Sequence, residues 1–380
     1  MKRYIAQNVY QAARERIGHC FDSFDNVLVS FSGGKDSGVL LNLCYEYAKE
    51  HDVLHKMAFY HLDYEAQYTY TTDYVTRTFE RFDNVRRFWL CLPVGANCGC
   101  KLDSDIWIPW NKPEKSRWCR KMPTGEYVIN ERNAPFYIEA GKKDYSVQDD
   151  FCDWFEREYG STAVLIGIRA DESLERYKLI RLVGWKPNPH RMFPIYDWKT
   201  EDVFTAYGKF GWDYNRLYDL YYQAGLSLAQ MRVANPFHTC GLANLKLYRV
   251  IEPNTWGKLL NRINGVNFGR LYGGTSALAF KAVQKPAHFT WEQYANFLME
   301  TNPQPLQKKK IKEYVLKWKK QGYRRGIPDE ADFFMEKKRD VPSWRKICKC
   351  ILSNDFQCKS LGFSTFRAKD IAGILEALRF

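Results

Sequence analysis

The stretch that decides the fold is Val27-Leu28-Val29-Ser30-Phe31-Ser32-Gly33-Gly34-Lys35-Asp36-Ser37. Its first five residues have the apolar character of a buried strand, and apolar residues recur at helical spacing from position 39 onward. Gly33 and Gly34 allow backbone amides to approach phosphate oxygens, and the following helix contributes its positive end. Lys35 adds charge to the hydroxyl groups on either side of it. The stretch therefore predicts an anion-binding loop between a strand and a helix.

The loop is not of the Walker type. That pattern needs a glycine five residues before Gly34, where this chain has Val29, and here Asp36 separates Lys35 from Ser37. An ordinary Gly-Gly turn is the plainer alternative. The direct passage from an apolar strand through the loop to an amphipathic helix favours phosphate binding.

Apolar strands alternate with helical segments through the first half of the chain. The pattern predicts helices at 4–17 and 151–159, and further strands at 57–62, within 85–94 and at 163–168. This order predicts an α/β fold with a mostly parallel, doubly wound sheet, in which ligands sit at the carboxyl ends of strands. Residues 95–149 show little periodicity and predict a long irregular excursion over that edge.

The second half of the chain has a different character. Helical patterns are predicted at 201–207, 214–224, 256–263 and 291–299. We therefore predict a nucleotide-binding domain at residues 1–205 and a mainly helical C-terminal domain at residues 206–380.

One segment of this C-terminal domain is strongly basic. Residues 307–326 contain nine Lys or Arg against one Glu, a local net charge of +8. The aromatic residues among the cations between Lys308 and Arg325 suit nucleic-acid binding by phosphate pairing and stacking. A solvated helical face explains the same pattern equally well.

Composition narrows the class of protein. Across 380 residues, 57 Lys+Arg against 44 Asp+Glu give a formal net charge of +13, which favours anionic partners such as nucleotides, nucleic acid or an acidic protein. No apolar run approaches the roughly 18 to 20 residues that cross a bilayer, and the N-terminus does not resemble an export signal. We expect a cytoplasmic protein without a membrane partner, with its eleven cysteines reduced.

The loop from Ser32 to Ser37 resembles the PP-loop of the adenine nucleotide alpha hydrolase superfamily, which includes ATP pyrophosphatases and phosphoadenosine phosphosulfate (PAPS) reductases. The segment from Gly167 to Ser173, with Arg176 beyond it, resembles the reductase segment that brings arginine to the phosphate or sulfate end of the nucleotide. Arg169, at the end of a strand beside the loop, would aim its guanidinium at a bound phosphate. A surface ion-pair cluster is the alternative.

Two other segments fit this resemblance. Residues 193–198, followed by residues 201–204, are similar to the family's turn into its next helix and imply a structural role. Asp63 matches the acidic position that closes the second strand, which implies contact with ribose or a metal. A helix cap or a salt bridge is an equally good explanation for Asp63.

Two segments of the second half, at 230–237 and 341–348, resemble an uncharacterised extension. It occurs on a bacterial subgroup of PAPS reductase-like proteins that includes the immunoglobulin-binding regulator A type. The resemblance implies a ParB-like or sulfiredoxin-like partner protein.

The cysteines depart from the reductase pattern. Assimilatory reductases carry a nucleophilic cysteine in a C-terminal tail, whereas this sequence ends Glu376-Ala377-Leu378-Arg379-Phe380. The Cys-Cys and Cys-x-x-Cys spacing of cluster-bearing relatives is missing too, so neither an iron–sulfur cluster nor zinc is expected. His238 lies two residues from Cys240 and would lower its pKa if the geometry allows, although core or capping roles are favoured for both.

Together these observations predict a protein that binds ATP or PAPS, with Mg²⁺ if ATP is used. It would cleave the α–β phosphate bond to adenylate a substrate, or take part in sulfur transfer. The alternative is a nucleotide-sensing regulatory subunit that acts with a ParB-like, DNA-associated partner. Lys35 and Arg169 are the predicted catalytic residues. The predicted nucleotide-binding residues are Ser30, Ser32, Gly33, Gly34, Lys35, Asp36, Ser37, Asp63, Arg169 and Arg176.

Overall fold

A computed structural model describes most of the chain. The described residues are 6–101, 104–188, 190–228, 230–238, 241–266, 285–301, 304–331, 341–353 and 355–361. Among them, no helix is both long enough and apolar enough to pass through a bilayer.

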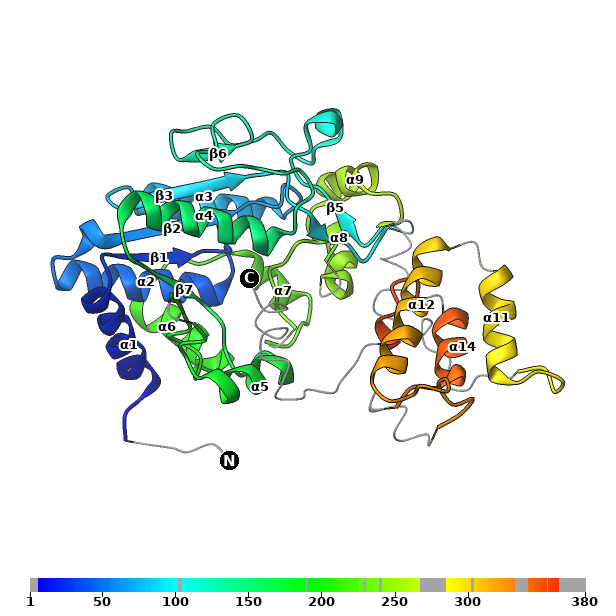
Figure 1. The fold of residues 1–380 in the computed structure, drawn as a ribbon. Helices are drawn as coiled ribbons and strands as arrows, with labels where there is room; N and C mark the ends of the chain where they lie inside the picture. The colour runs from blue at the N-terminus through cyan, green and yellow to red at the C-terminus, as the bar shows by residue number, and fades with distance from the viewer. Residues whose placement is uncertain are drawn as a thin grey trace.

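The main body is a parallel sheet of six strands with helices on both faces (Figure 1). The strands are β1 (Asn26–Ser30), β2 (Met57–Leu62), β3 (Arg86–Cys91), β6 (Val128–Asn130), β7 (Thr162–Ile166) and β8 (Arg191–Met192). Their order across the sheet is β6-β3-β2-β1-β7-β8, so the chain builds outward from β1 first in one direction and then in the other. The predicted α/β fold with a doubly wound sheet is confirmed.

Alternation along β1 explains why helices cover both faces. Val27 and Val29 enter a core made with α1 (Val9–Ser23), α2 (Lys35–Glu50), α3 (Thr69–Arg81) and α6 (Thr200–Phe210). Leu28 points to the opposite face, where it packs in a second core with α4 (Asp144–Tyr159). Successive strand side chains point to opposite faces, so a strand that is apolar throughout needs cover on both.

The excursion predicted at 95–149 is more ordered than the sequence indicated. It contains a short antiparallel pair, β4 (Ala96–Asn97) with β5 (Ile106–Trp107), and then β6, which pairs with β3 at the sheet edge. These strands are only two or three residues long, too short for alternation to be visible. The helix predicted from residue 151 begins at Asp144, because Val147 already lies one turn before the apolar Phe151 on the buried face.

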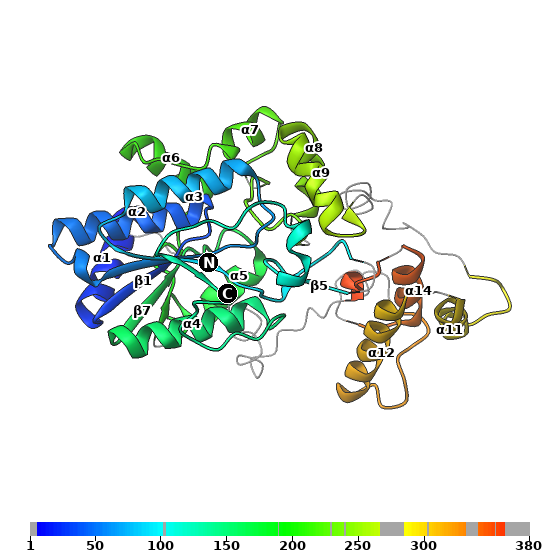
Figure 2. The same cartoon turned by 90° about the horizontal axis from the view of Figure 1, so that it is seen from above.

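The second half of the chain is helical, as predicted. Its helices are α5 (Leu174–Val183), α7 (Leu217–Gln223), α8 (Tyr248–Ile251), α9 (Pro253–Arg262), α11 (Trp291–Thr301), α12 (Pro305–Lys320) and α14 (Trp344–Leu352). α7, α8 and α9 pack on the main body, whereas α11, α12 and α14 share a separate small core and stand apart in Figure 2. Residue 205, where the domain boundary is predicted, lies inside α6.

Candidate nucleotide-binding site

The loop between β1 and α2 lies where the strand order reverses. β1 pairs with β2 on one side and β7 on the other, and in doubly wound sheets the carboxyl ends at such a point form the ligand crevice. Gly33 has φ +75°, and a Cβ there would lie 2.9 Å from Cγ2 of Val75. Gly167, just after β7, packs so closely that its Cβ would lie 3.0 Å from the amide nitrogen of Ser37. The two glycines hold the loop against α3 and β7.

The serines of the loop hydrogen-bond to one another. The hydroxyl oxygens of Ser32 and Ser37 lie 2.9 Å apart, and the Ser32 amide donates to the Ser37 hydroxyl at 3.1 Å. The Ser37 hydroxyl also lies 3.1 Å from the Gly34 carbonyl, to which it donates. Ser30, by contrast, ends β1 and its side chain interacts with the Tyr60 phenol. The structure therefore brings Ser32 and Ser37 together at the loop and directs Ser30 elsewhere.

Residues beyond position 205 brace the loop. The Tyr218 hydroxyl accepts from the Lys35 amide at 2.9 Å, and the Tyr207 hydroxyl donates to the Lys35 carbonyl at 2.8 Å. Asn215 donates to the Gly33 carbonyl at 3.1 Å. These three residues were missed in the sequence, because nothing in their spacing distinguishes them from the many other aromatic and polar residues of α6 and α7.

Lys35, Asp36 and Arg169 form a chain of charges beside the loop. Lys35 Nζ lies 3.0 Å from one carboxyl oxygen of Asp36, and Arg169 Nε lies 2.5 Å from the other. Lys35 is only 6% exposed, and burial lowers its pKa against the opposing charge of Asp36. A buried ammonium beside a helix N-terminus suits an anionic ligand.

Arg169 lies next to the loop, where its position after β7 places it. Its side chain is buried, and its guanidinium also donates to the Trp198 carbonyl at 3.3 Å and the Thr200 hydroxyl at 3.2 Å. It is therefore not part of a surface cluster. In this state Arg169 holds Asp36, and its predicted contact with phosphate stays a prediction.

Asp63 and Arg176 both have protein partners. Asp63 is fully buried; it pairs with Arg120 and accepts from the Trp89 indole at 2.6 Å. Burial opposes ionisation of Asp63, but Arg120 outweighs it and the pKa of Asp63 is lowered. Of the roles that the sequence left open, the structure shows the salt bridge. Arg176, in the first turn of α5, pairs with Glu172.

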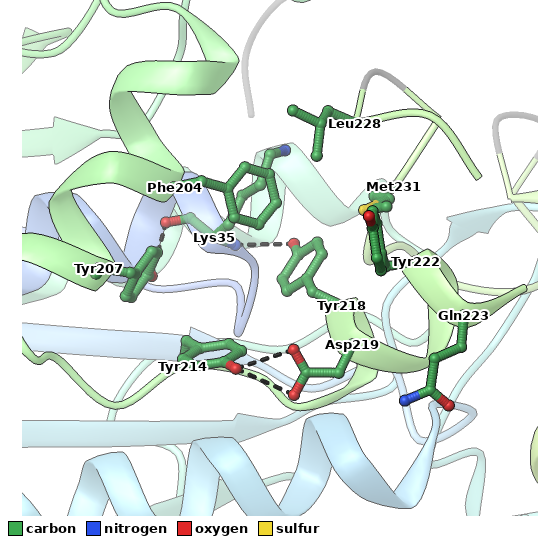
Figure 3. A pocket seen from close by; sticks show the side chains of 11 residues that line it. Lys35, Phe204, Tyr207, Tyr214, Tyr218, Asp219, Tyr222, Gln223, Leu228 and Met231 are labelled. Carbon is green, nitrogen blue, oxygen red and sulfur yellow. Dashed lines mark hydrogen bonds between the residues drawn. The ribbon is translucent and has the colours of Figure 1, made fainter. Parts of the chain in front are cut away.

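A cavity of about 630 Å³ opens beside Lys35 (Figure 3). Such a volume is within the range of small-molecule sites. Its wall is largely aromatic, with the Tyr214 hydroxyl hydrogen-bonded to Asp219 at 2.9 Å. The lining residues are Lys35, Phe204, Tyr207, Gly208, Tyr214, Tyr218, Asp219, Tyr222, Gln223, Leu228 and Met231.

The ten described cysteines are free thiols. Within the described part of the chain, no group of three or more His, Cys, Asp or Glu side chains is placed to hold a metal ion. Cys98 and Cys100 are buried near each other, and a hydrogen bond between them lowers the pKa of Cys98 to about 7. Cys240, predicted to interact with His238, lies outside the described residues.

The basic segment predicted in the C-terminal half forms α12. Its buried face consists of Gln307, Ile311, Tyr314 and Trp318, at helical spacing, so the aromatic residues Tyr314 and Trp318 belong to the small core. Lys309 and Lys312 are exposed, whereas Lys310 reaches the main body, where its Nζ lies 2.7 Å from a carboxyl oxygen of Asp105. The face available to a partner is basic, but these two aromatic rings do not lie on it.

Comparison with known proteins identifies the family. Residues 26–224, more than half of the chain, match the phosphoadenosine phosphosulfate reductase domain. The chain belongs to this family. The PAPS reductase resemblance of the loop and of the Arg169 segment is thereby confirmed at the level of the family. Residues 225–327 and 319–371 match a domain of unknown function (DUF3440). That this extension is of the immunoglobulin-binding regulator A type stays a prediction.

Other similarities extend over much of this PAPS reductase family member. It is 33% identical over 393 residues to "Uncharacterized protein YbdN" of Escherichia coli (strain K12), covering 98% of this chain and 94% of that one. Among solved structures, the FMN adenylyltransferase of Candida glabrata matches with a TM-score of 0.34 and 13% identity, over 57% of this chain and 62% of that one. The NH3-dependent NAD synthetase of Campylobacter jejuni subsp. jejuni NCTC 11168 matches with a TM-score of 0.32 and 10% identity, over 74% and 100%.

Proposed function

We propose that this protein binds an adenine nucleotide, ATP or a sulfonucleotide such as PAPS, with its phosphates on the loop from Ser32 to Ser37. The observation that carries the proposal is the buried Lys35 ammonium, which lies at the N-terminus of α2 and beside a cavity large enough for a nucleotide. The match of residues 26–224 to the PAPS reductase domain supports the same ligand class.

The loop can exchange its internal hydrogen bonds for bonds to phosphate. The Ser32 and Ser37 hydroxyls, now bonded to each other, can rotate to donate to phosphate oxygens. Lys35 would neutralise phosphate charge in a site where burial strengthens the attraction. Asp36 lies between Lys35 and Arg169 and orients both cations.

With ATP, the reaction that fits this arrangement is adenylation. A nucleophilic atom of the acceptor would attack the α-phosphorus, the bond between that phosphorus and the bridging oxygen would break, and pyrophosphate would leave. Charge develops on the leaving pyrophosphate, and Lys35, with Arg169 if Asp36 releases it, would stabilise that charge. With PAPS, the same anion site would hold the phosphosulfate group for sulfur transfer.

Mg²⁺ belongs to this proposal if the nucleotide is ATP, because it would neutralise phosphate charge. Mg²⁺ is commonly held by one or two carboxylates together with substrate phosphates. Asp36 is the carboxylate next to the loop, and its two oxygens are paired with Lys35 and Arg169. Asp36 would therefore have to release one cation to serve as a ligand, and the phosphates would supply the remaining contacts.

The test is a calorimetric titration of ATP, AMP, PAPS and adenosine phosphosulfate into the full chain and into Lys35→Ala. Loss of a charge-assisted hydrogen bond costs roughly 1.5 to 3 kcal/mol, so Lys35→Ala should weaken binding about tenfold to a hundredfold. Lys49→Ala is the matched control, because Lys49 lies exposed in the last turn of the same helix. Equal affinity of the two variants, or no binding by the wild type, would remove the proposal.

A second candidate is a nucleotide-sensing regulatory subunit with a DNA-associated, ParB-like partner. The basic face of α12 favours it, because that face lies in the small helical core rather than at the loop. Turnover separates the two candidates. Release of AMP and pyrophosphate from ATP indicates an enzyme, whereas tight ATP binding without turnover, together with nucleic-acid binding, indicates a sensor.

A further inference from the structure

The first residues of the domain of unknown function lie directly over the phosphate loop. A Cβ at Gly34 would lie 4.0 Å from the Cβ of Val233, so the extension passes within van der Waals contact of the loop. Met231 is buried and forms part of the wall of the cavity beside Lys35, together with Leu228 (Figure 3). These residues fall in the segment matched at 225–327, beyond the reductase domain itself. The two matched regions therefore meet at one site.

Arg232 lies between these two contacts. Its guanidinium donates to the Glu172 carbonyl at 2.9 Å, and the Glu172 carboxylate accepts from the Arg169 amide at 3.3 Å. This anchors Arg232 to the turn that follows β7. Arg232 is close enough to Lys35 for its charge to lower the Lys35 pKa, as does the charge of Arg169.

The charge balance around the loop leaves room for an anion. Lys35 and Arg169 share the single carboxylate of Asp36, while Arg232 is bonded to a neutral carbonyl. A guanidinium has five N–H donors in a planar fork that matches phosphate oxygens. Arg232 is exposed on its other side, so those donors are accessible to a ligand on the loop.

We propose that Arg232 is a phosphate-binding residue of this site, so that the extension completes the anion-binding surface that the PP-loop begins. The inference rests on the proposed function and adds its ligand chemistry. The groups recognised by Arg232 are the terminal phosphates of a nucleotide, or pyrophosphate alone. It follows that the extension is a component of the nucleotide site and not only a separate module.

The experiment compares the full chain with Arg232→Ala, Arg232→Lys and Arg249→Ala by calorimetry with pyrophosphate, ATP and adenosine. Arg249 is an exposed arginine of the same extension, on α8, and its replacement removes the same charge. Arg232→Ala should weaken pyrophosphate and ATP binding about tenfold or more and leave adenosine affinity unchanged. Arg232→Lys should retain part of the affinity, because it keeps the charge and loses the fork.

Each outcome decides the proposal. If Arg232→Ala binds pyrophosphate like Arg249→Ala, the proposal is wrong, and the proposed function stands as long as Lys35→Ala still weakens ATP binding. If Arg232→Ala weakens adenosine and pyrophosphate equally, Arg232 only supports the fold, which also overturns the proposal. If the wild type binds neither ATP nor PAPS nor pyrophosphate, the proposed function itself has failed.

Discussion

Gly33→Ala should destabilise the protein by two separable effects. Gly33 has φ +75°, a conformation that costs an L-residue roughly 1–2 kcal/mol. The added methyl would also lie 2.9 Å from Val75 Cγ2 and 3.2 Å from Thr71 Cγ2. Overpacking of this kind costs typically about 1–3 kcal/mol. The sum, about 2–5 kcal/mol, is a large part of the roughly 5–15 kcal/mol by which domains are stable.

The two effects can be measured apart by urea denaturation of matched variants. Gly211 has φ +65° with no atom within 4 Å of its Cβ position, so Gly211→Ala reports the backbone cost alone. Gly33→Ala should lose about 1–3 kcal/mol more unfolding free energy than Gly211→Ala. Combining Gly33→Ala with Val75→Ala should recover part of that difference, because the truncated side chain leaves room for the methyl group. The reasoning would be refuted by equal losses in the two single variants.

Two further predictions concern charges away from the loop. Asp63→Asn should cost about 3–5 kcal/mol at pH 7, because it leaves Arg120 buried without its carboxylate. Since the folded-state pKa of Asp63 is lowered, its contribution is present above the unfolded pKa of about 3.9 and is lost as pH falls through the folded value, so the variant should show a shallower acid decline in urea titrations. Replacement of Lys308, Lys309 and Lys312 by Ala, sparing Lys310 because it pairs with Asp105, should flatten the salt dependence of nucleic-acid binding by about 0.7–0.9 in logarithmic slope per lost phosphate contact. Fluorescence anisotropy at several salt concentrations measures this, and a slope equal to that of the wild type would leave a protein partner as the better explanation for the basic face.

The sequence located the centre of the site but not its surroundings. The strand, the two glycines and the helix after them are adjacent in the chain, so local pattern and backbone freedom were enough to predict an anion-binding loop there. The roles of Asp63 and Arg169 were left open, because a carboxylate or guanidinium at a strand end looks the same whether it faces a ligand or a protein partner. The structure places Asp63 on Arg120 and Arg169 on Asp36.

The sequence by itself determined the family, the parallel sheet and the position of the phosphate loop, because these depend on strand periodicity and on residues that are contiguous in the chain. Only the tertiary structure decided what surrounds that loop. The Tyr218 hydroxyl meets the Lys35 amide across 183 positions of sequence, and Val233 comes to rest over Gly34. Such contacts depend on how α6, α7 and the segment after them pack against α2. That packing is set by the burial of many apolar side chains together, and no local pattern records which polar groups it brings face to face.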